Sequence, residues 1–197
     1  MPVAKGTSLD PARTRAAILE AATAAFYDHG LDGVGVANLC SRTGVSKETL
    51  YRHFGSKQGL IEAVLEARSD KVTRWLRAAA DSAGPDPADR LAAVFDALAG
   101  WHGEPGFRGC ALVNAATQHH EGPARAVAAR HLDRRLALLE DIATLAGARD
   151  PGVLARQLLM LVSGSTTAAD LHPGSEPAAR HAREAALTLL AAAVPAR

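Results

Sequence analysis

Residues 43–60, which read TGVSKETLYRHFGSKQGL, hold cationic, hydroxyl and aromatic side chains at close spacing. Leu50 and Phe54 lie four residues apart, so in a helix they share one face and leave the polar side chains on the others. Lysine, arginine and tyrosine reach phosphates or base edges, and threonine contacts a base or a thymine methyl group. A short helix of this kind suits the major groove of DNA. A solvated helix in an ordinary helical bundle has the same pattern, so these residues alone leave both interpretations open.

The junctions of this stretch carry residues that end or begin helices. Gly44 can adopt the left-handed conformation that ends one helix, and Ser46 is a good N-cap for the next. Gly55 breaks that second helix, and Ser56 can cap a third. We therefore expect a tight turn, a short helix and the start of a longer helix at Lys57.

The same stretch is similar to the recognition segment of TetR-family transcriptional repressors. That segment reads G-V-S, three residues, L-Y, one residue, an aromatic residue or His, F, then S-K and L. The matching residues here are Gly44, Val45, Ser46, Leu50, Tyr51, His53, Phe54, Ser56, Lys57 and Leu60. The similarity extends back through Ile18, Ala21, Phe26, Gly30, Gly33 and Leu39, and covers roughly the first third of the chain. It implies an all-α protein with an N-terminal three-helix helix-turn-helix DNA-binding domain (residues 1–60) and a C-terminal helical ligand-binding and dimerisation domain (residues 61–197).

In such a regulator, one recognition helix from each subunit of a homodimer enters successive major grooves of a palindromic double-stranded DNA operator. The resemblance implies that Tyr51, His53 and Lys57 mainly contact phosphates, and that the other polar side chains of the short helix lie nearer the bases. Two arginines at the start of the first helix either approach the phosphate backbone or only solvate the helix end. The expected DNA-binding residues are Arg13, Arg15, Ser46, Lys47, Glu48, Thr49, Tyr51, Arg52, His53 and Lys57.

The chain departs from the family pattern before its second helix. Family members usually carry Thr or Ser where Val34 and Gly35 stand, and those hydroxyls cap the helix and touch a phosphate. Gly35 is a tolerable cap, but Val34 has no hydroxyl. This departure motivates the alternative of a helical small-molecule-binding or scaffold protein with a non-functional helix-turn-helix. Cys40 stands where Ala is common, and a small buried thiol is favoured there over a redox switch.

Composition and charge agree with a helical protein that meets DNA at one end. Hydrophobic residues make up 48% of the 197 residues and aromatic residues only 4%, and alanine supplies much of the apolar content. No alternating Val, Ile and Thr run lies between hairpin turns, which favours an all-α fold. The formal net charge is only +1, but residues 1–60 carry seven Lys and Arg against five Asp and Glu, a modest bias compatible with a DNA-binding face.

The cysteines and the hydropathy pattern bear on the compartment. Cys40 and Cys110 lie far apart and form no CxxC pair, which is typical of a reducing compartment. No apolar run resembles a signal peptide or approaches the length of a membrane span. We therefore expect a cytoplasmic protein without a membrane partner.

Helical periodicity and turn residues predict about nine helices. The expected ranges are 11–29, 36–43, 47–54, 57–80 and 88–101, then a helix that ends near His120, then 123–145, 151–171 and 176–194. The helix over 123–145 is expected to bury Val127, Leu132, Leu136, Leu139 and Ile142. Residues 107–115, which read FRGCALVNA, also resemble a stretch in one subgroup of TetR-like regulators.

The second domain is expected to hold an unknown small-molecule effector and to form the dimer. The resemblance implies a largely apolar cavity, and aromatic walls with a few polar groups suit one. The candidate lining residues are Trp75, Phe95, Trp101, His102, Phe107, Cys110, Asn114, Gln118 and Met160. Each of these residues could instead be plain core or surface. Small residues in the last two helices suit a two-fold four-helix interface, although that face could pack only within its own chain.

The residues do not indicate an enzyme. The adjacent His119 and His120 would point about 100° apart in a helix, so they cannot both face one metal ion without distortion. No zinc-ligand spacing, phosphate-binding glycine loop or nucleophile motif is present, and we expect no metal, cofactor or catalytic residue. The favoured function is therefore a TetR-like regulator, a repressor that a small-molecule effector releases from its operator.

Overall fold

The computed structural model describes residues 10–172 and 178–195, and these residues form nine helices joined by turns. Contacts divide the chain into two compact units, residues 1–68 and 69–197. The division falls inside α4 (Lys57–Ser82), so this helix belongs to both units. The functional boundary expected between residues 60 and 61 lies in the same helix and stays a prediction.

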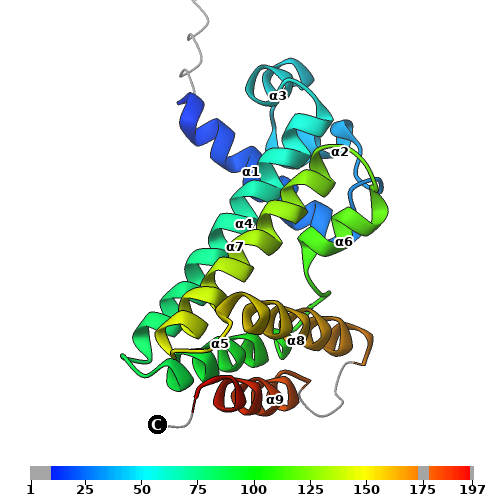
Figure 1. The fold of residues 1–197 in the computed structure, drawn as a ribbon. Helices are drawn as coiled ribbons and strands as arrows, with labels where there is room; N and C mark the ends of the chain where they lie inside the picture. The colour runs from blue at the N-terminus through cyan, green and yellow to red at the C-terminus, as the bar shows by residue number, and fades with distance from the viewer. Residues whose placement is uncertain (1–9, 173–177, 196–197) are drawn as a thin grey trace, which may run out of the picture. The chain divides into compact units, whose positions relative to one another are not determined.

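The first unit holds α1 (Pro11–His29), α2 (Val36–Thr43), α3 (Lys47–Phe54) and the beginning of α4 (Figure 1). Local chemistry sets their ends as the sequence predicts. Gly44 ends α2 in the left-handed conformation, with φ 69° and ψ 14°. Ser46 Oγ accepts a hydrogen bond from the backbone N–H of Thr49 at 3.1 Å, and Ser56 Oγ accepts one from Gly59 at 3.0 Å. The start of α3 and the start of α4 are therefore both fixed by serine caps.

Gly59 allows the sharp junction between α3 and α4. It lies in the first turn of α4, against the carbonyl oxygen of Phe54, the last residue of α3. A Cβ atom at this position would collide with that oxygen. Only glycine therefore fits here without a shift of the backbone of α3.

A small apolar core holds the helices of the first unit. Its fully buried side chains come from all four helices: Ile18, Ala22, Ala25, Leu39, Leu50 and Leu60. Burial of a leucine side chain contributes about 1.5–3 kcal/mol relative to leaving it in water. Leu50 therefore fixes one face of α3 to this core and leaves its other faces to the solvent.

The second unit continues α4 to Ser82 and adds five further helices among the described residues. They are α5 (Pro87–His102), α6 (Ala111–Gln118), α7 (Pro123–Leu145), α8 (Pro151–Leu171) and α9 (Ala178–Ala193). The bounds predicted for α7 and α8 are confirmed. Residues 176 and 177, where the last helix is expected to begin, lie outside the described residues. Within residues 10–172 and 178–195, no helix combines the length and the apolar character that a membrane crossing requires.

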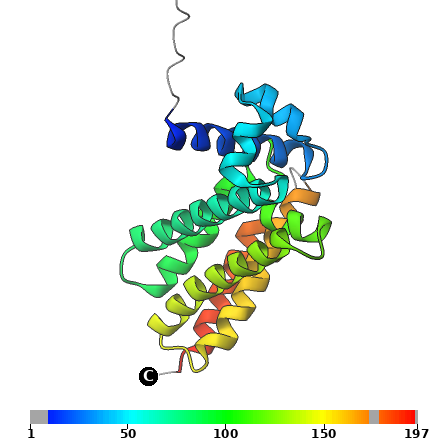
Figure 2. The ribbon, with the colours of Figure 1, turned by 90° about the horizontal axis from the view of Figure 1, so that it is seen from above.

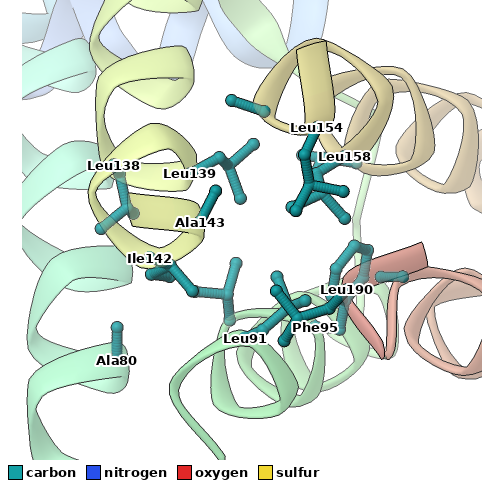
Figure 3. Close-up of a cluster of buried hydrophobic side chains, with 14 of the residues drawn as sticks. Ala80, Leu91, Phe95, Leu138, Leu139, Ile142, Ala143, Leu154, Leu158 and Leu190 are labelled. Carbon is teal, nitrogen blue, oxygen red and sulfur yellow. The ribbon is translucent and has the colours of Figure 1, made fainter. Parts of the chain in front are cut away.

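The core of the second unit lies among α5, α7, α8 and α9. Figures 1 and 2 both show α8 and α9 side by side, and α5 packs on α9. Figure 3 shows apolar side chains of these helices pointing toward a common interior, where Phe95, Leu139 and Leu158 are almost fully buried. This interior fixes the positions of the helices that surround it.

The buried face of α7 differs from the one that the sequence predicts. Leu132 and Leu136 are only partly buried, whereas His131 is fully buried and Arg135 is 3% exposed. The buried residues include positions 127, 131, 135, 138 and 142, which have the spacing of one helical face. Two basic residues therefore occupy positions that a purely apolar stripe would give to leucine.

Aromatic rings pack against the core where α5 ends. The Trp101 ring meets Trp75 at 6.2 Å and Phe107 at 4.9 Å between centroids, both edge to face, and His102 lies 4.9 Å from Phe107. Both ring nitrogens of His102 are buried and have no hydrogen-bond partner. Burial first, and then the positive charge of Arg135, lower the pKa of His102 from 6.5 to about 4. The ring is therefore neutral at pH 7.

We expect the stability of the protein to depend on pH through His102. Between pH 6.5 and about 4, the unfolded chain binds a proton at this ring and the folded protein does not. The free energy of unfolding should therefore fall as the pH decreases across this range. Denaturant unfolding at a series of pH values measures the effect, and His102→Gln should flatten this part of the curve.

His120→Gln, at an exposed position, is the matched control and should keep the wild-type pH dependence. If the His102→Gln protein kept the pH dependence of the wild-type protein, the inference that the buried His102 ring is neutral would be wrong.

Candidate nucleic-acid interface and effector cavity

The outer faces of α3 carry the residues predicted to meet DNA. Leu50 is fully buried beneath the helix. The polar side chains of α3 are all exposed or partly exposed: Lys47, Glu48, Thr49, Tyr51, Arg52 and His53. The helix therefore has the apolar inner face and the cationic, aromatic outer face that its sequence predicts.

Contacts between neighbours hold some of these side chains in place. Lys47 Nζ lies over the Tyr51 ring, 5.6 Å from its centroid. Ser46 Oγ, which caps α3, also lies 3.0 Å from the Thr49 hydroxyl. Ser46 thus acts first as the cap that positions α3, and Tyr51 positions the ammonium group of Lys47.

The two arginines of α1 differ in their surroundings. The Arg15 guanidinium lies over the Phe54 ring of α3, 5.0 Å from its centroid, although Arg15 remains exposed. Arg13 is exposed near the start of α1. Arg15 is therefore held beside α3, and for both arginines the choice between a phosphate contact and solvation of the helix end stays a prediction.

Most cations on the described helices of the first unit form no ion pair with a described carboxylate. Six of the cations on these helices lie on α1, α2, α3 or at the start of α4: Arg13, Arg15, Arg42, Lys47, Arg52 and Lys57. Across the described residues, none of the six forms an ion pair with a carboxylate; the ion pairs between Arg77 and Asp141, and between Arg90 and Asp81, are in the second unit. These six groups are therefore available to an external polyanion.

Arg42 is a candidate that the sequence analysis does not assign to the interface. It is exposed at the end of α2, and its Nε donates a hydrogen bond to Oδ1 of Asn38 at 2.8 Å. Asn38 and Arg42 lie four residues apart, so both side chains are on one face of α2, and this pair could be identified from the sequence.

Val34 and Gly35, which stand before α2 where family members usually carry Thr or Ser, do not disturb the helix. Val34 is 2% exposed and belongs to the core of the first unit. Gly35 caps α2 without a side-chain hydrogen bond. Because glycine at an N-cap costs only a few tenths of a kcal/mol relative to serine, the helix tolerates this exchange. A missing hydroxyl at these two positions thus leaves α2 intact.

The residues expected to line an effector cavity lie in different surroundings. Four of them form the aromatic group at the end of α5: Trp75, Trp101, His102 and Phe107. Phe95 belongs to the main core, Met160 is 66% exposed on α8, and Gln118 is exposed at the end of α6. The structure brings Cys110 and Asn114 together at one cavity, and a ligand role for any of the nine stays a prediction.

This cavity has a volume of about 250 Å³ and lies among α6, α7, α8 and the segment before α6. Its lining residues are Gly109, Cys110, Val113, Asn114, Arg135, Ser163, Thr166, Thr167, Asp170 and Leu171. Asn114 Nδ2 donates to the carbonyl oxygen of Arg108 at 2.8 Å, which fixes the amide in the wall. Arg135 is absent from the predicted lining because the leucines beside it, Leu132 and Leu136, suggest a different buried stripe on α7. The four-residue spacing from Val127 through His131 is the signal in the sequence that points to Arg135.

Buried polar contacts join the cavity wall to α4. Cys110 Sγ lies 3.9 Å from Nε2 of His131, and Nδ1 of the same ring lies 3.0 Å from Oγ of Ser69 on α4. Arg134 Nη1 donates to Ser69 Oγ at 2.8 Å and to Asp70 Oδ1 at 3.0 Å. Because Ser69 and His131 have no exposed surface, the contact between these two side chains is shielded from water, and with the partly exposed bonds of Arg134 it holds α7 against α4.

The histidines and acidic residues do not gather into a metal site in the part of the chain that the structure describes. No group of three or more His, Cys, Asp and Glu side chains there could hold a metal ion. His119 and His120 follow the last residue of α6, and His119 has extended backbone angles (φ −123°, ψ 94°). These two histidines therefore do not share the helix on which the sequence analysis placed them.

Comparisons with known proteins agree with this geometry. The family model described as "Bacterial regulatory proteins, tetR family" matches residues 18–64, which include α2, α3 and the start of α4. The activator FasR of Mycolicibacterium smegmatis is 34% identical over 106 residues, which are 53% of this chain and 48% of FasR. The repressor Rv3405c of Mycobacterium tuberculosis is 36% identical over 81 residues, 41% of this chain and 40% of the repressor. The chain thus spans about half the length of these curated relatives, or less.

The similarity to a solved structure covers both units. A structure from Streptomyces avermitilis, described as that of a TetR transcriptional regulator, is 32% identical in sequence and has a TM-score of 0.77. The match covers 91% of this chain and 97% of that one. The family model matches the segment that forms α2 and α3, and the solved structure matches nearly the whole length of both chains. The chain therefore belongs to the TetR family of bacterial regulatory proteins.

Proposed function

We propose that the protein is a homodimeric DNA-binding transcriptional regulator, and that it acts as a repressor released from a palindromic operator by a small-molecule effector. One observation carries this proposal: α3 is fixed by Leu50 and capped by Ser46, and the cations around it pair with no carboxylate among the described residues. Unpaired cations on a rigid helix are what a major groove and its phosphates recognise. The proposal assigns no catalytic activity to the chain and places it in the cytoplasm with its DNA.

The exposed side chains divide into two groups by their reach. Tyr51, His53 and Lys57, with Arg15 and Arg42, would contact phosphates and fix the position of α3. Base edges would be read by the side chains on the outer face of α3: Lys47, Glu48, Thr49 and Arg52. Each phosphate contact should contribute about 0.9 to the slope of log affinity against log salt concentration.

Effector release would act through α4, which belongs to both units. The cavity wall reaches this helix through Cys110, His131 and Ser69. A ligand that binds better to one arrangement of α7 and α4 shifts the population toward it, and by linkage it must weaken DNA binding if that arrangement misplaces the recognition helices.

The homodimer would form through α8 and α9. The outward face of α8 carries large apolar side chains in water: Val153 is 42% exposed, Met160 is 66% exposed and Leu171 is 68% exposed. Gly164 lies on the same face, and a Cβ atom there would meet nothing within 4 Å, so a helix of a second subunit can approach closely. Apolar and small residues on one face are suited to a two-fold four-helix interface.

We expect Tyr51→Ala to reduce affinity for the operator at least tenfold, about 1.4 kcal/mol, because it removes a phosphate contact and the ring under Lys47. The protein should remain folded, since Tyr51 is partly exposed and surface changes usually stay within about 0.5 kcal/mol. Fluorescence anisotropy measures the affinity for a selected operator, and far-UV circular dichroism measures folding.

Tyr51→Phe is the matched control, because it keeps the ring and removes only the hydroxyl group. It should lose less affinity than Tyr51→Ala. Wild-type affinity in Tyr51→Ala would show that α3 does not dock as proposed, and it would favour the alternative, ligand binding by a protein whose helix-turn-helix no longer reads DNA.

Met160→Glu should convert the dimer to monomers, since it places a carboxylate in the proposed apolar interface. Sedimentation velocity at micromolar concentration measures this change. Leu145→Glu is the control: Leu145 is 52% exposed at the end of α7, outside the proposed interface. Equal dimer content in both variants would place the interface elsewhere.

A further inference from the structure

The cavity among α6, α7 and α8 contains one feature that its role as an effector cavity does not by itself explain. Arg135 lines the cavity and is 3% exposed, yet its Nε and Nη2 atoms are buried without a hydrogen-bond partner. Nor does any carboxylate within the described residues form an ion pair with it. A guanidinium group stays charged at any pH a protein survives, so a buried positive charge is left without an ion-pair partner in the part of the chain that the structure describes.

The adjacent residue on α7 shows the ordinary arrangement. Arg134 is ion-paired with Asp70 at 3.0 Å and is hydrogen-bonded to Ser69. Buried charges in proteins are normally paired, because the loss of hydration is large. Within residues 10–172 and 178–195, Arg134 therefore has a carboxylate partner and Arg135, one residue later, has none.

A neighbouring ring responds to this charge. The positive charge of Arg135 adds to burial in holding the pKa of His102 at about 4, and the ring nitrogens of His102 have no hydrogen-bond partner either. A nearby carboxylate that compensated Arg135 would weaken this effect. Among the described residues the charge of Arg135 thus has no paired carboxylate, and a bound anion would supply the missing partner.

We propose that this cavity binds a small organic monocarboxylate, whose carboxylate group pairs with the guanidinium of Arg135. The planar fork of arginine matches a carboxylate through two parallel hydrogen bonds. A volume of about 250 Å³ falls below the 300–1,000 Å³ of sites for drug-sized ligands, so the ligand is small. The identification of this anion with the effector rests on the proposed function; the binding site itself does not.

The rest of the lining sets further limits on the ligand. Val113, Leu171 and Cys110 offer apolar surface to a short hydrocarbon part. Asp170 lines the same cavity, and its carboxylate lies close to Gly109, because a Cβ atom added to that glycine would be only 2.9 Å from Oδ2 of Asp170. A second negative charge on the ligand would meet this carboxylate, so dicarboxylates should bind more weakly than monocarboxylates of the same length.

The first test is a thermal-unfolding titration of the full chain with monocarboxylates from acetate to benzoate, their primary amides, and succinate. Ligand that binds only the folded state raises the unfolding temperature with concentration. At least one monocarboxylate should raise it, while the matching amide and succinate should raise it less or not at all. No rise with any monocarboxylate, or an equal rise with the amides, would overturn the proposal.

Two neighbouring variants then separate a binding role for Arg135 from a structural one. Arg135→Met should abolish the response to the carboxylate and should keep or raise the unfolding temperature without ligand, because it removes an unpaired buried charge. Arg134→Met should lower that temperature and keep the carboxylate response, because its ion pair is lost and the cavity is not. An Arg135→Met protein that was destabilised as much as Arg134→Met, or that still responded to carboxylate, would overturn the proposal.

The operator measurement distinguishes this proposal from the proposed function. A carboxylate that stabilises the wild-type protein and dissociates its operator complex supports both. A stabilising carboxylate that requires Arg135 but leaves DNA binding unchanged supports the anion site and contradicts its role as effector site. If the protein binds no operator at all, the proposed function fails, and the unfolding titration still decides the anion site.

Discussion

One face of α4 has to be buried along the whole helix, and the rest of the structure depends on this constraint. Positions 61, 65, 69, 72, 76 and 80 have the spacing of a single helical face, and the side chains there are buried or partly buried. The polar member of this stripe is Ser69, the first residue of the second unit, with no exposed surface. A buried hydroxyl group is costly unless it is hydrogen-bonded, so His131 and Arg134 hold α7 at this point of α4. Helix α7 is therefore tied to the helix that continues into the first unit.

The helices themselves could be predicted from the sequence because their ends are local. Ser46, Gly44 and Ser56 specify caps and turns through bonds to residues three or four positions away. Pro123 and Pro151 likewise mark the first positions of α7 and α8. Helix α3 could be predicted from one buried leucine and a polar remainder, which define its two faces.

The cavity could be predicted only in part, because it depends on tertiary packing. Cys110 and Asn114 come from a motif that the sequence analysis singles out, but Arg135 and Asp170 belong to helices distant in the chain. The apolar Leu132 and Leu136 suggest a buried stripe one position away from the real one, and only the packing of α7 shows that Arg135 lies inside. The rings of Trp75 and Trp101 pack against each other and against the core, and neither residue lines this cavity.

Whether α3 reads DNA can be measured by selecting bound duplexes from a random-sequence library. The selection is carried out with the purified full chain at two salt concentrations. We expect a palindromic motif whose half-sites lie about one helical turn, or a multiple of it, apart, with recovery that falls steeply at the higher salt concentration. Recovery of unrelated sequences with no common motif, at either salt concentration, would show that α3 does not read DNA.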